Sequence, residues 1–100
     1  MYYPISISAV RKAVQRFAPS VVSEECELRS GGEAPLKHLL WMCDKVERMD
    51  TTSIDDAVKA GRWMGWIFAH IELRCIWNNQ ETRSLVRQDK KNGHDKPHQK

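Results

Sequence analysis

The side chains that most often perform chemistry are few in this sequence, and their spacing does not bring them together. His38 and Cys43 lie five residues apart, so they do not share a helical face and are not expected to form a base–nucleophile pair. His94 and His98 have the H-x-x-x-H spacing of a metal site. A glycine and a proline in that stretch oppose a helix, however, and no further ligand is evident. We therefore expect a non-enzyme with no catalytic residue, no metal and no cofactor.

The three cysteines, Cys26, Cys43 and Cys75, form no C-x-x-C pair. This spacing excludes a zinc ribbon and a thioredoxin-like motif, and it suggests no disulfide framework. We therefore expect a cytoplasmic, reducing environment. Cys43 and Cys75 fall on apolar faces of predicted helices, where a free thiol is usually a small buried hydrophobe.

Tryptophan is the most distinctive residue type, with four copies in 100 residues. Trp and Arg dominate the energetics of protein interfaces. In a long helix predicted over 54–77, one side gathers Lys59, Arg62, Trp63, Trp66, His70, Leu73, Arg74 and Trp77. Two interpretations fit: a second core face with snorkelling cations, or a contact surface. The second predicts that partner binding uses Trp63, Trp66, His70, Arg74 and Trp77.

The opposite side of that helix is lined by small residues. It gathers Ile54, Ala57, Val58, Gly61, Gly65, Phe68, Cys75 and Ile76. Gly61, Gly65 and Ala69 recur every four residues, and two glycines cost about 2 kcal/mol of helix propensity relative to alanine. We therefore predict close helix packing at Gly61 and Gly65, either within the chain or between two copies in a dimer.

The remaining elements are also helical, so the predicted fold is an all-α small bundle. Apolar spacing predicts helices at about 6–17 and 35–49, with buried stripes through Ile7, Val10, Val14 and Phe17, and through Leu36, Leu39, Leu40, Cys43 and Val46. Ser53 and Asp56 form an S-x-x-D capping box at the start of the long helix. A short acidic helix within 20–33, and another capped by Asn78 and Glu81 with Leu85 and Val86, complete the prediction.

Size and charge define the domain organisation. The chain has a net charge of +3 and 41% hydrophobic residues, and its mean hydropathy is −0.60. These values predict a soluble protein with one helical domain over 1–88 and a flexible basic tail over 89–100, which has no apolar residue. The longest apolar stretch is too short and too polar to cross a bilayer. Cations near the end are possible phosphate or secondary contacts: Arg83, Arg87, Lys90 and Lys91.

Two stretches carry a family resemblance: PLKHLLWMCDKVERM at 35–49 and KAGRWMGWIFAHIELRCIW at 59–77. Together with the basic tail they resemble small accessory proteins of lambdoid phages, above all the phage anti-RecBCD protein family, over residues 34–88. The resemblance implies a non-enzymatic protein of the host bacterial cytoplasm that binds the RecBCD helicase–nuclease, protecting phage DNA ends or promoting recombination. The alternative is a small DNA-binding regulator that contacts nucleic acid through the Trp/Arg stripe and the basic tail.

Overall fold

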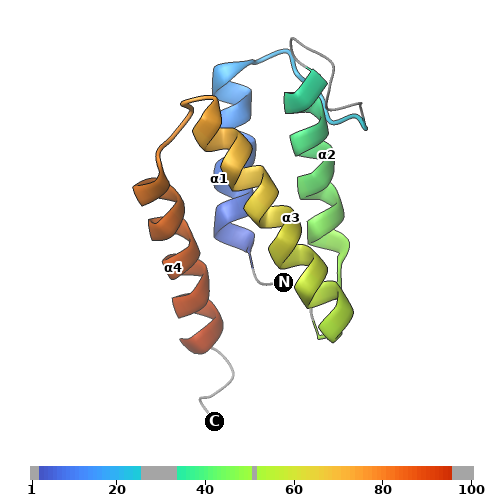
Figure 1. Ribbon diagram of the computed structural model, residues 1–100, viewed down its shortest axis with the longest axis vertical. Helices are drawn as coiled ribbons and strands as arrows, with labels where there is room; N and C mark the ends of the chain where they lie inside the picture. Colours follow the sequence, from blue (N-terminus) through green and yellow to red (C-terminus); the bar gives the residue numbers. More distant parts are fainter. Residues whose placement is uncertain (1–2, 26–33, 51, 96–100) are drawn as a thin grey trace.

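The computed structural model of the protein describes residues 3–25, 34–50 and 52–95. Within these ranges it contains four helices: α1 (Pro4–Phe17), α2 (Ala34–Arg48), α3 (Ile54–Leu73) and α4 (Asn79–Asp95). The all-α class is therefore confirmed. Helix α1 packs against α2 and α4, and α2 packs against α3. In Figure 1, α4 lies at the left beside α1, α2 lies at the right, and α3 crosses diagonally in front. No helix in the described ranges is both long and apolar enough to span a membrane.

Helix α1 begins at Pro4, whose fixed φ and missing N–H suit the first turn of a helix. Ile7, Val10 and Val14 are fully buried, as their spacing predicts. The prediction for Phe17 was wrong, because this side chain is 55% exposed. The helix ends there, and Ala18 and Val21 enter the core in its place.

Helix α2 buries the whole predicted stripe: Leu36, Leu39, Leu40, Cys43 and Val46. Met42, which lies off that stripe, is buried as well. Burial raises the pKa of the Cys43 thiol to about 12. Cys43 is therefore a core residue, as expected, and not a nucleophile.

The buried stripe of α3 lies between the small-residue side and the Trp/Arg side that the sequence predicts. Its core residues are Ala60, Met64, Ile67, Phe68 and Ile71. The prediction of close helix packing within the chain was wrong, because a Cβ at Gly65 would have nothing within 4 Å. At Gly61 a Cβ would meet only the Tyr3 hydroxyl oxygen, at 3.7 Å. Contact between two copies through these glycines stays a prediction.

Helix α3 ends at Leu73, four residues earlier than predicted. Cys75 adopts a left-handed φ of 59°. The Cys75 amide donates to the Glu72 carbonyl at 3.0 Å, and the Ile76 amide donates to the Ile71 carbonyl at 3.1 Å. These two bonds form a Schellman motif with cysteine in the place usually taken by glycine. Cys75 is consequently exposed, which corrects the prediction that its thiol is buried.

The two predicted capping boxes have different outcomes. Ser53 is the N-cap of α3, but its side chain makes no capping hydrogen bond. Asp56 instead accepts a bond of 2.9 Å from the Asp50 amide. The box at α4 is confirmed, because Asn78 and Glu81 exchange two backbone–side-chain bonds of 3.0 Å. This box fixes where α4 begins.

Helix α4 corrects the predicted boundary between domain and tail, because residues 89–95 are helical. Asp89 is only 4% exposed. Its carboxylate accepts hydrogen bonds from the Ile5 amide at 2.8 Å, the Ser6 amide at 3.0 Å and the Ser6 hydroxyl at 2.6 Å. Asp89 therefore caps the N-terminus of α1 from another helix. Residues 96–100 of the predicted tail lie outside the described residues.

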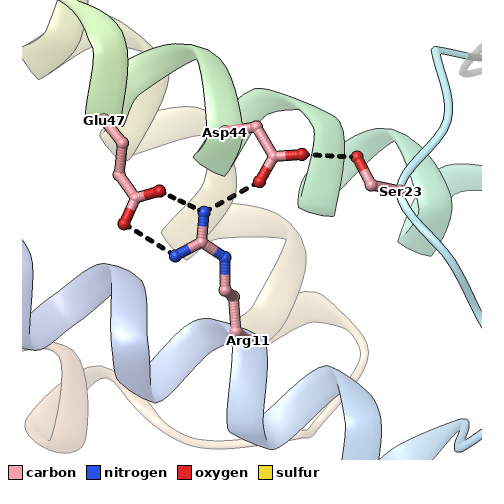
Figure 2. Close-up of polar contacts among 4 residues, drawn as sticks. All are labelled: Arg11, Ser23, Asp44 and Glu47. Atoms are coloured by element: carbon pink, nitrogen blue, oxygen red, sulfur yellow. Dashed lines mark hydrogen bonds and ion pairs between the residues drawn. The ribbon is translucent and has the colours of Figure 1, made fainter.

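The chain between α1 and α2 is described as far as Glu25 and is not helical there. The prediction of a short helix within 20–33 was therefore wrong for residues 20–25. Residues 26–33 lie outside the described ranges. Figure 2 shows how this segment is tied to the bundle. Arg11 of α1 donates to Glu47 and, at 2.8 Å, to Asp44 of α2. The Ser23 hydroxyl donates to the other Asp44 oxygen at 2.7 Å.

Candidate functional site

The side of α3 opposite its core stripe is exposed and largely apolar. Ile54 is 80% exposed, Val58 59% and Leu73 78%. At 100° per residue these three positions fall in one sector of about 100°. We call this surface the outer face of α3; it consists of Ile54, Asp55, Val58, Arg62, Gly65, Trp66, Ala69, Glu72 and Leu73. Trp66 is half-buried on it, and Arg62, Gly65 and Ala69 are exposed.

An aromatic cluster joins α2 to α3 beside this face. The Trp41 ring stacks on His38, with ring centres 5.1 Å apart, and on Trp63, with ring centres 5.9 Å apart. Lys45 lies 5.3 Å from the Trp41 ring centre, and Lys59 lies 5.3 Å from the Trp63 ring centre. These cation–π contacts hold two positive charges over half-buried indoles. The cluster therefore forms a positively charged aromatic patch where α2 meets α3.

Trp66 and His70 form a second aromatic pair, one turn apart on α3. Their ring centres are 3.7 Å apart, and the rings are within 20° of parallel. Partial burial lowers the pKa of His70, and the charges of Arg74 and His38 lower it further. At neutral pH the imidazole is therefore uncharged, and its ring stacks on the indole without a formal charge.

Trp77 lies apart from the other predicted contact residues. Its indole nitrogen donates to the Thr82 hydroxyl at 2.8 Å, which in turn donates to Glu72 at 2.7 Å. Its ring lines a groove between α1 and α4. The prediction of one stripe through Trp63, Trp66 and Trp77 was thus wrong, because α3 ends before Trp77. Arg74 occupies the C-cap of α3 and is half-buried.

The structure adds residues to the site that the sequence interpretation missed. Ile54 and Val58 lie on the small-residue side that the sequence predicts to pack against another helix, yet both are exposed. Trp41 joins the aromatic cluster from α2. A signal for Trp41 was present: His38, Trp41 and Lys45 recur at spacings of three and four residues, away from the leucine stripe.

The predicted phosphate contacts Arg83, Arg87, Lys90 and Lys91 are all exposed on α4. Their spacing places them on one side of that helix, which faces away from the buried residues Thr82 and Asp89. They are not part of the surface formed by α2 and α3.

Among the described residues, no group of three His, Cys, Asp or Glu side chains is arranged to hold a metal ion. The Arg11, Asp44 and Glu47 charges are engaged with one another across α1 and α2. What the arrangement provides is an exposed helix face with aromatic and cationic borders, which is suited to contact with another molecule.

Comparison of the chain with protein-family models, with curated proteins and with solved structures finds no match.

Proposed function

We propose that the protein is a non-enzymatic protein-binding modulator that docks through the outer face of α3. The observation that carries this proposal is the exposure of Ile54, Val58 and Leu73 on a single helix face beside Trp66. Single exposed apolar residues are common on protein surfaces, but several large exposed apolar residues on one helix face are typical of an interaction site. Complete burial of one such aliphatic side chain is favourable by about 1.5–3 kcal/mol.

The aromatic neighbours of this face are already ordered before binding. Trp63 is held between Trp41 and Lys59, and Trp66 is stacked on His70. Ordering a side chain at an interface costs about 0.5–1.5 kcal/mol, so a surface whose rings are already fixed loses less on association. These contacts favour a binding surface that keeps its shape.

The chemistry of the face indicates the partner it would accept. An apolar groove would cover Val58, Trp66 and Leu73. Acidic groups at its rim would meet Lys59 and Arg62 of α3, and Arg74 at its C-cap. The resemblance of 35–49 and 59–77 to the phage anti-RecBCD family makes the host RecBCD helicase–nuclease the first partner to test.

Binding to purified RecBCD, and inhibition of its nuclease on linear duplex DNA, test the proposal directly. Trp66→Ala combined with Leu73→Ser should weaken binding at least tenfold, because both side chains lie on the outer face. Val22→Ser is the matched control, since Val22 is exposed but lies between α1 and α2. Circular dichroism should show unchanged helix content in both variants.

Two results would contradict this proposal. Full binding by the Trp66/Leu73 variant would exclude the outer face of α3 as the contact surface, and no binding by the wild-type chain would exclude RecBCD as the partner. Sedimentation of the free protein tests whether a second copy of the chain covers the outer face of α3. A dimer that Gly65→Leu disrupts would show that a second copy occupies it.

A further inference from the structure

A groove of about 340 Å³ runs between α1 and α4, on a different part of the molecule from the outer face of α3. In Figure 1, α4 lies at the left and α1 lies next to it, behind α3, whereas α2 lies at the right. The groove is lined by Ala9, Lys12, Ala13, Arg16, Trp77, Glu81, Ser84 and Leu85. A second hollow on α4 shares Ser84 with it and is lined by Gln80, Ser84, Arg87, Gln88 and Lys91.

The two helices run antiparallel along the groove. Asp89 of α4 contacts the start of α1, while Trp77, just before α4, shares the groove with Arg16 near the end of α1. Residues 9–16 of α1 therefore give the groove a length of about 10 Å, at 1.5 Å per residue. Its α1 side carries Lys12 and Arg16, and its α4 side carries Glu81, Ser84 and Leu85. Arg87 and Lys91 lie in the adjoining hollow, beyond Ser84.

Positive charge dominates this part of the surface. Six cations on α1 and α4 are exposed: Lys12, Arg16, Arg83, Arg87, Lys90 and Lys91. Helix α1 contains no acidic residue, and Glu81 is the one exposed acid in the described side chains of α4, because Asp89 is buried at the N-terminus of α1. None of these six cations takes part in an ion pair among the described residues. Exposed charge among the described side chains of the two helices is thus +5, whereas the net charge of the whole chain is +3.

We infer that this groove binds single-stranded nucleic acid. Lys12 and Arg16 on the α1 side of the groove, and Arg87 and Lys91 in the adjoining hollow on α4, would contact backbone phosphates. The Trp77 ring, oriented by its bond to Thr82, would stack on an unpaired base at the end of the groove. Stacking of this kind requires a base that is free of its complementary strand, which favours a single strand over a duplex.

The composition of the groove favours a polyanion over an acidic helix of a protein partner. Its apolar floor consists of two alanines and Leu85, which offers little area for the anchor residues of an amphipathic helix. Unpaired cations on the α1 side of the groove and in the adjoining hollow on α4 instead favour a ligand whose negative charges repeat along a chain. Release of counterions from such a chain supplies much of the binding free energy.

Fluorescence anisotropy with a labelled 20-nucleotide oligo(dT) tests the inference on the full chain. Four phosphate contacts predict a slope of about −3 for log K against log salt, so affinity should fall about 50-fold between 50 and 200 mM salt. Lys12→Glu combined with Arg16→Glu should weaken binding at least tenfold at 50 mM salt and reduce the slope by about 1.4. Quenching of tryptophan fluorescence by oligo(dT) should disappear in Trp77→Phe.

The charge-matched control is Arg48→Glu on α2 combined with Arg62→Glu on α3, which should leave oligo(dT) affinity within twofold of wild type, since both residues are exposed and neither lines the groove. Equal loss in both double variants, tighter binding of a 20-base-pair duplex, or equal affinity for polyglutamate would each overturn the inference. The RecBCD assay uses a different surface and different variants, so failure of one proposal does not imply failure of the other.

Discussion

Cys75 shows how one residue determines which tryptophans share a surface. It occupies the left-handed position of the Schellman motif that ends α3. The chain turns there, which separates Trp77 from Trp66 and places the two rings in different sites. For a residue with a Cβ, the left-handed conformation costs about 1–2 kcal/mol, whereas glycine adopts it freely.

Cys75→Gly should therefore stabilise the protein by about 1 kcal/mol and raise its Tm by about 4–8 °C. The thiol is exposed, so little packing is lost on its removal. Thermal unfolding followed by circular dichroism measures the change. Cys75→Ala is the control, because it removes the thiol but keeps the Cβ and should leave Tm nearly unchanged. A glycine variant no more stable than the alanine variant would contradict the role given to the left-handed backbone.

His70 makes the stability of α3 sensitive to pH. Its pKa is lowered in the folded state by partial burial and by Arg74 and His38. The unfolded chain therefore binds a proton more readily than the folded chain. The stability that the neutral ring contributes is complete above the unfolded pKa of about 6.5, and it is lost as pH falls through the folded pKa.

We expect the His70 imidazole to titrate below pH 6.5 in NMR spectra of the folded protein. His70→Gln should reduce the decrease in Tm between pH 7.5 and pH 5, because glutamine does not titrate in that range. An equally steep decrease in the variant would assign the pH dependence to other groups.

At the scale of elements, α4 is held to the bundle mainly by polar contacts. It buries Thr82 and Asp89, with Val86 partly buried against the core. The Asp89 carboxylate supplies the negative charge that the first turn of α1 lacks in its own sequence. The positions of the two helices are thus linked through one side chain.

Asp89→Ala should destabilise the protein by about 2–3 kcal/mol, because it leaves the amides of Ile5 and Ser6 and the Ser6 hydroxyl without their acceptor. Hydrogen exchange should increase first in α4 and in the first turn of α1. The control is Asp55→Ala in the exposed first turn of α3, which should cost about 0.5 kcal/mol. Comparable losses in the two variants would show that Asp89 acts only as a surface charge.

These contacts also explain which elements were predictable from the sequence. Helices α1 and α2 follow from apolar spacing, because each buries one wide face. The predicted end of α4 is too early, because Asp89 looks like a tail residue in the local hydropathy pattern. Asp89 is buried only because it caps α1, and a local pattern cannot reveal a partner that is distant in the sequence. The predicted contact residues Trp63, Trp66 and His70 are brought together on α3. Trp77 is not, because cysteine does not signal a left-handed turn as glycine would.

At the scale of the whole molecule, α1 connects the two proposed surfaces. On one side Arg11 ties it to Asp44 and Glu47 of α2, the helix that supports the aromatic cluster. On the other side α1 and α4 together form the basic groove. A modulator of a DNA-processing complex would use such an arrangement to contact protein and single strand at the same time.

The Arg11 network gives the molecule a defined response to acid. The hydrogen bond that Arg11 donates to Glu47 raises the pKa of Arg11. Partial burial lowers it, but the hydrogen bond to Asp44 raises it again, and the net direction is upward. Partial burial by itself would raise the pKa of Asp44. The hydrogen bonds that Asp44 accepts from Ser23 and Arg11 outweigh this, so the pKa of that carboxyl is lowered. The bond from Arg11 lowers the pKa of Glu47. Both carboxylates therefore stabilise the fold above their unfolded pKa values of about 4, and this contribution is lost as pH falls through their folded values.

Arg11→Met should cost about 1 kcal/mol at pH 6, a modest figure because the three side chains are each about one-third exposed. The difference from wild type should shrink towards zero at pH 2.5, where protonation of Asp44 and Glu47 removes the ion pairs from the wild-type protein as well. Urea unfolding at the two pH values measures this change. Lys12→Met is the matched control: it removes the same charge from the neighbouring exposed position, which has no ion pair in the described structure, and should cost less than 0.5 kcal/mol at either pH. A difference for Arg11→Met that stays constant between pH 6 and pH 2.5 would show that its hydrocarbon contacts, and not its carboxylate partners, hold α1 to α2.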